Sequence, residues 1–185
     1  ELEFYNNMDT KHREQFVEGD WNVFENIKAF LYAFDMTKNV GTVEQDKGSV
    51  CHISFDFNVN PITAILFNVD VLNRKLRVFK EFRIENSDIH VLLKNIIEDY
   101  PSTLGYEATG DASGKARNIN IPNGLTTYDI ISRKLRMPPA RIKVPRRNLG
   151  HLDSRVVCNT VLEKYDVLID SKCEYLIQDI LSVEA

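Results

Sequence analysis

Apolar and polar residues alternate through the stretch SVCHISFDF, residues 49–57, and a period of two is typical of a β-strand with one buried face. From residue 51 on, the odd-numbered positions are apolar and share one face, whereas the even-numbered positions end in Asp56 on the other. Two further strand-like runs follow over 62–69 and 75–84. Three closely spaced strands with short connections predict an antiparallel meander.

Helical spacing replaces alternation after the third strand. Ser87 is expected to cap a helix that Pro101 stops, because the apolar residues between them recur every three or four positions. Farther along, the pattern predicts strands over 103–109, 140–144 and 166–170, with helices over 126–136 and 153–165. In the last helix we expect a capping box, Ser171 with Glu174, and the buried positions Cys173, Leu176, Ile177, Ile180 and Leu181.

The predicted order of elements is that of a ribonuclease H-like α/β fold. In this fold a central mixed sheet, made of the three-strand meander plus parallel strands, is flanked by helices. Residues 1–46 are more irregular, and we expect an extended or partly helical lead-in that packs its aromatic side chains on the body. These aromatics are Phe16, Trp21, Phe24, Phe30, Tyr32 and Phe34.

Bulk composition favours a globular protein of a reducing compartment. The 185 residues are 43% hydrophobic and 27% charged, without an apolar run of the roughly 18–20 residues that span a bilayer. No secretory signal pattern opens the chain. The three cysteines lie far apart without a CxxC pair, which argues against a disulfide scaffold and a structural zinc site.

Charge is distributed very unevenly. The net charge of the chain is −4, yet residues 115–155 hold ten lysines or arginines against two aspartates, a local +8. Phosphates respond to such a local field, so the region is a candidate polyanion contact, although solvated helix faces explain the charge equally well. Within it, residues 138–148, PPARIKVPRRN, are called the basic segment below. The candidate DNA-binding residues are Lys115, Arg117, Arg133, Lys134, Arg141, Lys143, Arg146 and Arg147.

Two aspartates are expected to meet at one edge of the sheet. In the predicted fold the first and fourth strands are parallel neighbours about 4.8 Å apart, so Asp56 and Asp111 converge at their ends. Carboxylate oxygens suit Mg²⁺ or Mn²⁺, and a metal pair can activate water and stabilise the leaving oxygen of a phosphodiester. Each aspartate also has a purely structural interpretation, Asp56 as a turn former at the strand end and Asp111 as a cap on the following segment.

The turn GDASGKARN, residues 110–118, fits the same chemistry. Gly110 and Gly114 allow backbone and substrate to approach closely, while Lys115 and Arg117 are placed to meet phosphates. 

These motifs resemble the nuclease domain of the large terminase subunits of tailed phages and prophages. FDFNVNPITA, residues 55–64, is similar to the family's first acidic motif, with its metal aspartate at Asp56, and GDASGKARN to the second, with Asp111. Residues 4–40 resemble the segment that links the packaging ATPase to the nuclease. DSRVVCNTVL and LIDSKCEYLIQDI resemble the helix and the strand-helix that close the domain.

The resemblance implies a metal-dependent endonuclease that cuts concatemeric double-stranded DNA during genome packaging. Asp56 and Asp111 are then the catalytic, metal-binding pair for Mg²⁺ or Mn²⁺, with a two-metal site. The implied partners are DNA, the portal and the small terminase subunit, in the cytoplasm of a bacterial host. No GxxxxGK[ST] loop is present, so 1–46 is expected to be the linker after an absent ATPase domain, and 47–185 the nuclease domain.

One element of the family pattern is missing from the sequence. The third metal aspartate lies in a His-x-x-Asp-Ala-like motif that residues 1–185 do not contain, so we expect it beyond them; Glu107 and Asp179 are weaker substitutes. Two alternatives stay open: a junction resolvase or transposase-type nuclease, and a non-catalytic module that docks on DNA or the portal.

Overall fold

The computed structural model describes residues 8–16, 18, 28–58, 60–116 and 125–185. The chain divides into two compact units. Unit 1 comprises Glu1–Val43, Asp70–Leu76 and Leu149–Ala185, and unit 2 comprises Glu44–Val69 and Arg77–Asn148. Each unit is described by itself.

Unit 2 is built on four neighbouring strands in the order β4-β3-β2-β5. The bounds are β2 Cys51–Asp56, β3 Ile62–Asp70, β4 Lys75–Ile84 and β5 Tyr106–Gly110. Strands β2 and β3 are antiparallel, with Phe55 opposite Ala64, whereas β5 runs parallel to β2. The predicted meander and the parallel pairing of the first and fourth strands are therefore confirmed.

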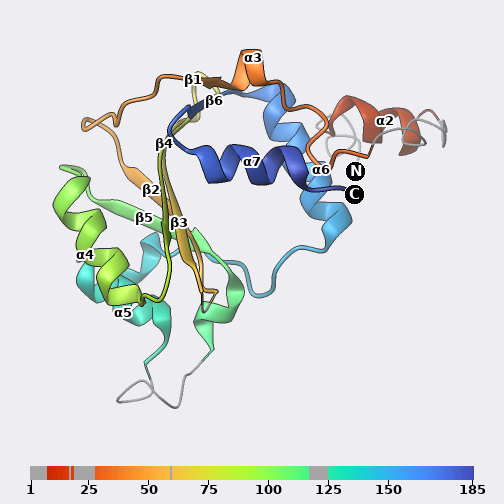
Figure 1. The fold of residues 1–185 in the computed structure, drawn as a ribbon. Helices are drawn as coiled ribbons and strands as arrows, with labels where there is room; N and C mark the ends of the chain where they lie inside the picture. Colours follow the sequence, from red (N-terminus) through yellow and green to blue (C-terminus); the bar gives the residue numbers. More distant parts are fainter. Residues whose placement is uncertain (1–7, 17, 19–27, 59, 117–124) are drawn as a thin grey trace. The chain divides into compact units, whose positions relative to one another are not determined.

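The alternation along β2 separates a core face from a more open face. Ile53 is 0% exposed and Phe55 2%, while Asp56 at the strand end is exposed. Helices α4 (Ile89–Asp99) and α5 (Thr127–Lys134) lie on one side of these strands in Figure 1. The ring of Phe57 contacts Tyr128 of α5 edge-on, which identifies the odd-numbered side of β2 as the side that α5 covers. The mixed α/β class predicted from the sequence is confirmed.

The start of α4 differs from the prediction by one residue. Asp88, and not Ser87, is the N-cap: its Oδ1 accepts hydrogen bonds from the backbone N–H groups of His90 and Val91. The Ser87 hydroxyl is buried and has no hydrogen-bond partner among the described residues. Asp88 has the extended backbone of an N-cap, with φ of −132° and ψ of 173°, so it and not Ser87 takes the capping position.

Unit 1 joins the described part of the lead-in to the C-terminal elements. It contains α2 (Thr10–Phe16), α3 (Met36–Asn39), β1 (Val40–Gly41), α6 (His151–Lys164), β6 (Asp166–Asp170) and α7 (Glu174–Ser182). Strand β1 runs parallel to β6, with Val40 opposite Ile169. Trp21 and Phe24 of the predicted aromatic cluster lie outside the described residues.

Buried amides hold these two parts of unit 1 together. Asn159 of α6 accepts from the backbone N–H of Ala33 at 2.9 Å and donates to the carbonyl of Phe30 at 3.0 Å. Asn39 donates to the carbonyl of Val167 at 2.9 Å. Both asparagines are fully buried. Residues 28–43 are thus fastened to α6 and β6, and the division of the chain at residue 46 stays a prediction.

Two predictions near the C-terminus are wrong. The capping box at Ser171 does not form, because Asp170 Oδ1 accepts from the Lys172 N–H and the helix begins later, with Cys173 as an N-cap that makes no side-chain bond. Leu181 is 59% exposed rather than buried, although Ile177 and Cys173 are buried as expected.

The predicted strand over 140–144 is also wrong. Pro139–Arg141 form a 3₁₀ turn, η3, and only Ile142 bridges to β5, at Ala108. The prolines at 138 and 139 lack backbone N–H groups and favour this turn over a ladder.

Candidate metal centre and basic segment

Asp56 and Asp111 occupy adjacent positions at the ends of two parallel strands of unit 2. Phe55 of β2 pairs with Gly110 of β5, and the Asp111 N–H donates to the Phe55 carbonyl at 3.1 Å. Each aspartate is the next residue along its strand. The sequence-predicted pair is therefore brought together by the register of the sheet.

The two carboxyl groups differ in their electrostatic environment. Burial raises the pKa of Asp56, and the negative charge of Asp111 raises it further, against a smaller lowering by the Asn58 N–H. The pKa of Asp111 is lowered, first by the backbone N–H of Ser113 and then by the side chain of Asn148. A cation beside the two carboxylates would offset the repulsion by which Asp111 raises the pKa of Asp56.

Each carboxylate is held by an asparagine amide. Asn58 Nδ2 donates to Asp56 Oδ2 at 2.7 Å, and Asn148 Nδ2 donates to Asp111 Oδ1 at 2.8 Å. Asp111 Oδ1 also accepts from the Ser113 N–H at 2.8 Å. The side-chain bonds thus fall on one oxygen of each group. Within the described part of the chain, the opposite oxygens meet no side-chain donor.

Asp111 is at the same time the N-cap of the 3₁₀ helix η1, Ala112–Lys115. The structural interpretation of this aspartate is therefore correct. Because capping uses Oδ1, it leaves Oδ2 for a further ligand. The hydroxyl of Tyr128, on α5, donates a hydrogen bond to the Asp111 carbonyl at 3.0 Å and thereby stabilises the same turn.

The two glycines of the motif are required by protein contacts. Gly110 has φ of 136°, and a Cβ there would lie 2.1 Å from the Phe55 carbonyl oxygen. A Cβ on Gly114 would lie 2.3 Å from Phe57 and 2.7 Å from Tyr128. The close backbone approach expected at Gly110 is confirmed, whereas Gly114 is needed for packing against two aromatic rings.

The basic segment lies beside β5. The Lys143 N–H donates to the Ala108 carbonyl at 2.7 Å, and Thr109 Oγ1 donates to the Lys143 carbonyl at 2.8 Å. Lys115 Nζ donates to the carbonyls of Val144 and Pro145 at 2.5 and 3.2 Å. These bonds fix the backbone of the segment within unit 2, next to the turn that carries the second acidic motif.

The cationic side chains of the predicted DNA surface fall into two groups. Lys115 and Arg141 are engaged with backbone carbonyls; Arg141 donates to those of Leu104 and Tyr106, at 2.8 and 3.4 Å. The remaining described members are exposed: Arg133, Lys134, Lys143, Arg146 and Arg147. Arg117 lies outside the described residues.

Arg155, counted above in the positive region, belongs to unit 1 and is only 8% exposed. Its guanidinium donates to the carbonyls of Ala29 and Phe30. It is thus a structural residue.

No third carboxylate joins the pair within the part of the chain that the structure describes, where no group of three His, Cys, Asp or Glu residues is placed to hold a metal. Glu107 lies four residues before Asp111, and its Oε1 pairs with His52 Nδ1 across the strands at 3.4 Å. Asp179 belongs to α7 of unit 1.

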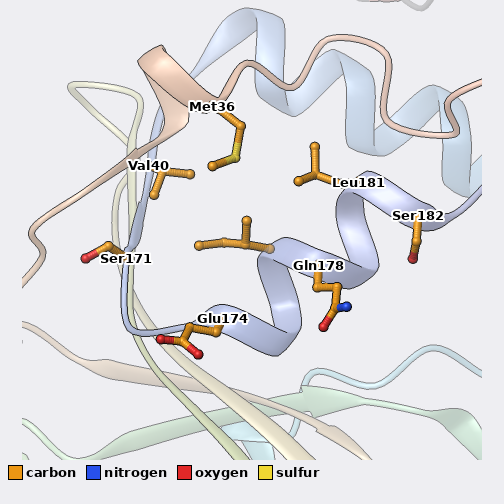
Figure 2. Close-up of a pocket in the computed structure, with 8 residues that line it drawn as sticks. Met36, Val40, Ser171, Glu174, Gln178, Leu181 and Ser182 are labelled. Atoms are coloured by element: carbon orange, nitrogen blue, oxygen red, sulfur yellow. The ribbon is translucent and has the colours of Figure 1, made fainter.

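A hollow of different character occurs in unit 1 (Figure 2). It measures about 470 Å³ and lies between α3 and α7, lined by Met36, Val40, Ser171, Glu174, Ile177, Gln178, Leu181 and Ser182. Its surface is mostly apolar, and Glu174 is its one ionisable side chain. It therefore has the wrong donor set for a hard cation.

None of the described helices is both long and apolar enough to cross a membrane.

Sequence reasoning missed Asn58 and Asn148 as partners of the aspartates. Asn58 follows Asp56 by two residues, a spacing at which a side chain returns to its neighbour. Asn148 is 37 residues from Asp111, and no local signal connects them.

Comparison with known proteins gives the fold. No protein-family model matches the chain, and no curated protein matches it significantly. Among solved structures, the large terminase of a thermophilic bacteriophage superposes with a TM-score of 0.60 at 19% identity, covering 93% of this chain and 43% of that one. The nuclease domain of the P22 large terminase superposes with a TM-score of 0.60 at 8% identity, covering 82% of this chain and 77% of that domain.

The chain thus has the ribonuclease H-like α/β fold of phage large-terminase nuclease domains. It spans less than half the length of the whole phage terminase that it matches. The resemblance seen in the sequence motifs is confirmed as a resemblance of fold.

Proposed function

We propose that the chain is the nuclease module of a phage or prophage large terminase, a divalent-metal-dependent endonuclease that cuts concatemeric double-stranded DNA during genome packaging. The observation that carries the proposal is the adjacency of Asp56 and Asp111 at the ends of parallel strands β2 and β5. The chain shares its fold with a terminase nuclease domain. Asp56 and Asp111 lie in the two sequence motifs that resemble the acidic motifs of that family.

The donor set at this edge fits a hard divalent cation. Both ligands are carboxylates, the charge of one raises the pKa of the other, and the amides of Asn58 and Asn148 occupy only one oxygen of each. Such oxygen ligands suit Mg²⁺ or Mn²⁺. When bound, one or two cations supply a polarised water and charge stabilisation for the leaving oxygen of a phosphodiester.

The residues of the chain contribute orientation and charge. Asp56 and Asp111 hold the cation against the sheet edge. The exposed side chains of Lys143, Arg146 and Arg147 lie on a segment braced to the same turn, and they bind the phosphate backbone without reading bases. Cleavage is therefore largely independent of sequence. As the resemblance to terminase nucleases implies, it leaves 3′-hydroxyl and 5′-phosphate ends.

The larger assembly follows from the same proposal. As part of a terminase, the module works in the cytoplasm of a bacterial host, with the portal and the small terminase subunit as partners and the DNA concatemer as substrate.

The test is Mn²⁺-dependent nicking of supercoiled plasmid by wild type, Asp56→Asn and Asp111→Asn. Both variants are expected to lose activity, since an amide cannot replace a carboxylate ligand. Asp88→Asn is the matched control: it changes the exposed N-cap aspartate of α4, whose capping bonds an asparagine accepts equally well. Cleavage that persists in both site variants would exclude the two-aspartate mechanism.

The same experiments separate the alternatives. Preferential cutting of branched over linear DNA would point to a junction resolvase or transposase-type nuclease. Salt-sensitive DNA binding without Mn²⁺ binding in calorimetry would point to a non-catalytic docking module.

A further inference from the structure

Asn148 uses both ends of its amide at the second acidic motif. Its Oδ1 accepts from the backbone N–H of Ala112 at 2.9 Å, and its Nδ2 donates to Asp111 Oδ1 at 2.8 Å. The residue is exposed and closes the basic segment, directly after Arg147.

The backbone N–H of Ala112 determines which way the amide points. A backbone N–H can only donate, so the oxygen of Asn148 must face it. The NH₂ group is then directed at Asp111. An inverted amide would place two donors against each other at Ala112 and two acceptors against each other at Asp111.

The orientation of Asn148 in turn constrains the carboxylate. Asp111 Oδ1 receives two donors, the Ser113 N–H and Asn148 Nδ2, from different parts of the chain. Rotating the carboxylate by half a turn would exchange its equivalent oxygens, but smaller rotations would break one bond or both. Asp111 therefore keeps one plane, with Oδ2 turned away from its donors.

We propose that Asn148 is a positioning residue for the metal centre: it holds the Asp111 carboxylate in a single orientation for a divalent cation and joins that carboxylate to the basic segment. The inference rests on the proposed function. It adds that the end of the basic segment contributes to the metal site. Asn148 directly follows Arg147, and Lys115 Nζ donates hydrogen bonds to the carbonyls of Val144 and Pro145 in the same segment.

Asn58 makes a weaker case for the same role. It reaches Asp56 from two residues away, which is the ordinary local bond of an asparagine after a strand. Asn148 reaches Asp111 from 37 residues away, so the bond forms only when the basic segment is in place.

The first measurement is the Mn²⁺ dissociation constant of Asn148→Ala by isothermal titration calorimetry. Removing a partner that orients a metal ligand weakens affinity by roughly 10- to 100-fold, and we expect at least the lower figure. Asn73→Ala is the matched control, because Asn73 Nδ2 donates to Asp70 in a turn of unit 1 and repeats the same pair chemistry away from the site. Its affinity should equal that of the wild type.

The second measurement uses the wild-type protein and needs no variant to fold. In NMR spectra recorded during a Mg²⁺ titration, the side-chain NH₂ signals of Asn148 and the backbone amide of Ala112 should shift in step with binding. The NH₂ signals of Asn73 should not. Shifts of these signals would place the bound cation beside the Asn148–Asp111 pair. Binding that leaves Asn148 unshifted, or unchanged affinity in Asn148→Ala, would overturn the inference.

The outcomes distinguish this inference from the proposed function. If Asp56→Asn and Asp111→Asn abolish Mn²⁺ binding while Asn148→Ala does not weaken it, the inference fails alone. If neither aspartate variant affects binding, the metal centre itself is wrong, and the inference fails with it.

Discussion

Replacing Gly110 with alanine should disrupt the strand pair that brings the two aspartates together. The φ of this glycine is 136°, which L-residues rarely adopt, and a Cβ would lie 2.1 Å from the Phe55 carbonyl oxygen and 2.7 Å from the Phe55 nitrogen. The obstructing atoms are backbone atoms of β2. Neither strand can therefore relieve the overlap by turning a side chain.

The expected cost follows from two terms. A residue held in a sparsely populated backbone region costs about 1–3 kcal/mol. Displacing β5 from β2 also breaks the bond from the Asp111 N–H to the Phe55 carbonyl, which contributes about 0.5–1.5 kcal/mol. The free energy of unfolding should fall by about 2–4 kcal/mol, and a loss of 3 kcal/mol corresponds to a melting temperature lower by about 6–12 °C in a chain of this size.

The assay is thermal and urea denaturation followed by circular dichroism. Gly150→Ala is the control, because a Cβ there would lie an ordinary 3.7 Å from Asp153 Oδ2 and the φ is −66°. That change should cost less than about 1 kcal/mol. Equal stability of Gly110→Ala and wild type would refute the assigned register of β2 and β5.

Two further predictions concern charge. Without metal at neutral pH, Asp56→Asn should raise the melting temperature and Asp111→Asn should lower it, because the folded protein disfavours the ionised form of the first and favours that of the second. Because the pKa of Asp56 is raised in the folded protein, its ionised carboxylate lowers the free energy of unfolding at neutral pH, and this effect disappears as the pH falls through the folded pKa. Because the pKa of Asp111 is lowered, its carboxylate adds to the free energy of unfolding above the unfolded pKa, and this contribution is lost as the pH falls through the folded pKa. Scanning calorimetry from pH 7 to pH 3 checks both signs, and changes of the same sign at pH 7 would contradict the assignment. Separately, the double variant Arg146→Ala with Arg147→Ala should reduce the slope of log affinity for DNA against log salt by about 2, whereas Lys94→Ala on α4 should leave it unchanged; equal slopes would remove the phosphate contact.

The alternation of residues 49–57 was sufficient to predict β2 and its two faces, because the hydrophobic pattern fixes which side chains of a half-buried strand face the core; the observed strand is shorter, Cys51–Asp56. The pairing with Asp111 required a further step, the parallel adjacency of the first and fourth strands. That step came from the order of elements. The sheet register then confirms it through Phe55 and Gly110.

Helix starts were harder to predict where two polar residues compete. At Ser87 and Asp88, both side chains are acceptable caps, and only the backbone geometry of the folded chain selects the carboxylate. At Ser171, the neighbouring Asp170 takes the turn N–H first. Which of two neighbouring residues caps a helix depends on a free-energy difference of about 1 kcal/mol, and the sequence pattern alone does not reveal it.

The distant partner of Asp111 lay beyond sequence reasoning for a different reason. Asn148 meets Asp111 only because the basic segment returns beside β5, held there through Ala108 and Thr109. No periodicity encodes such a contact between loops.

The most direct test of the account is a crystal structure of the chain soaked in Mn²⁺, with the anomalous signal of manganese measured. We predict an anomalous peak between the carboxylates of Asp56 and Asp111, with oxygen ligands from both. Carboxylate oxygens that point to opposite sides of the sheet, or manganese bound elsewhere while this pair stays empty, would contradict it.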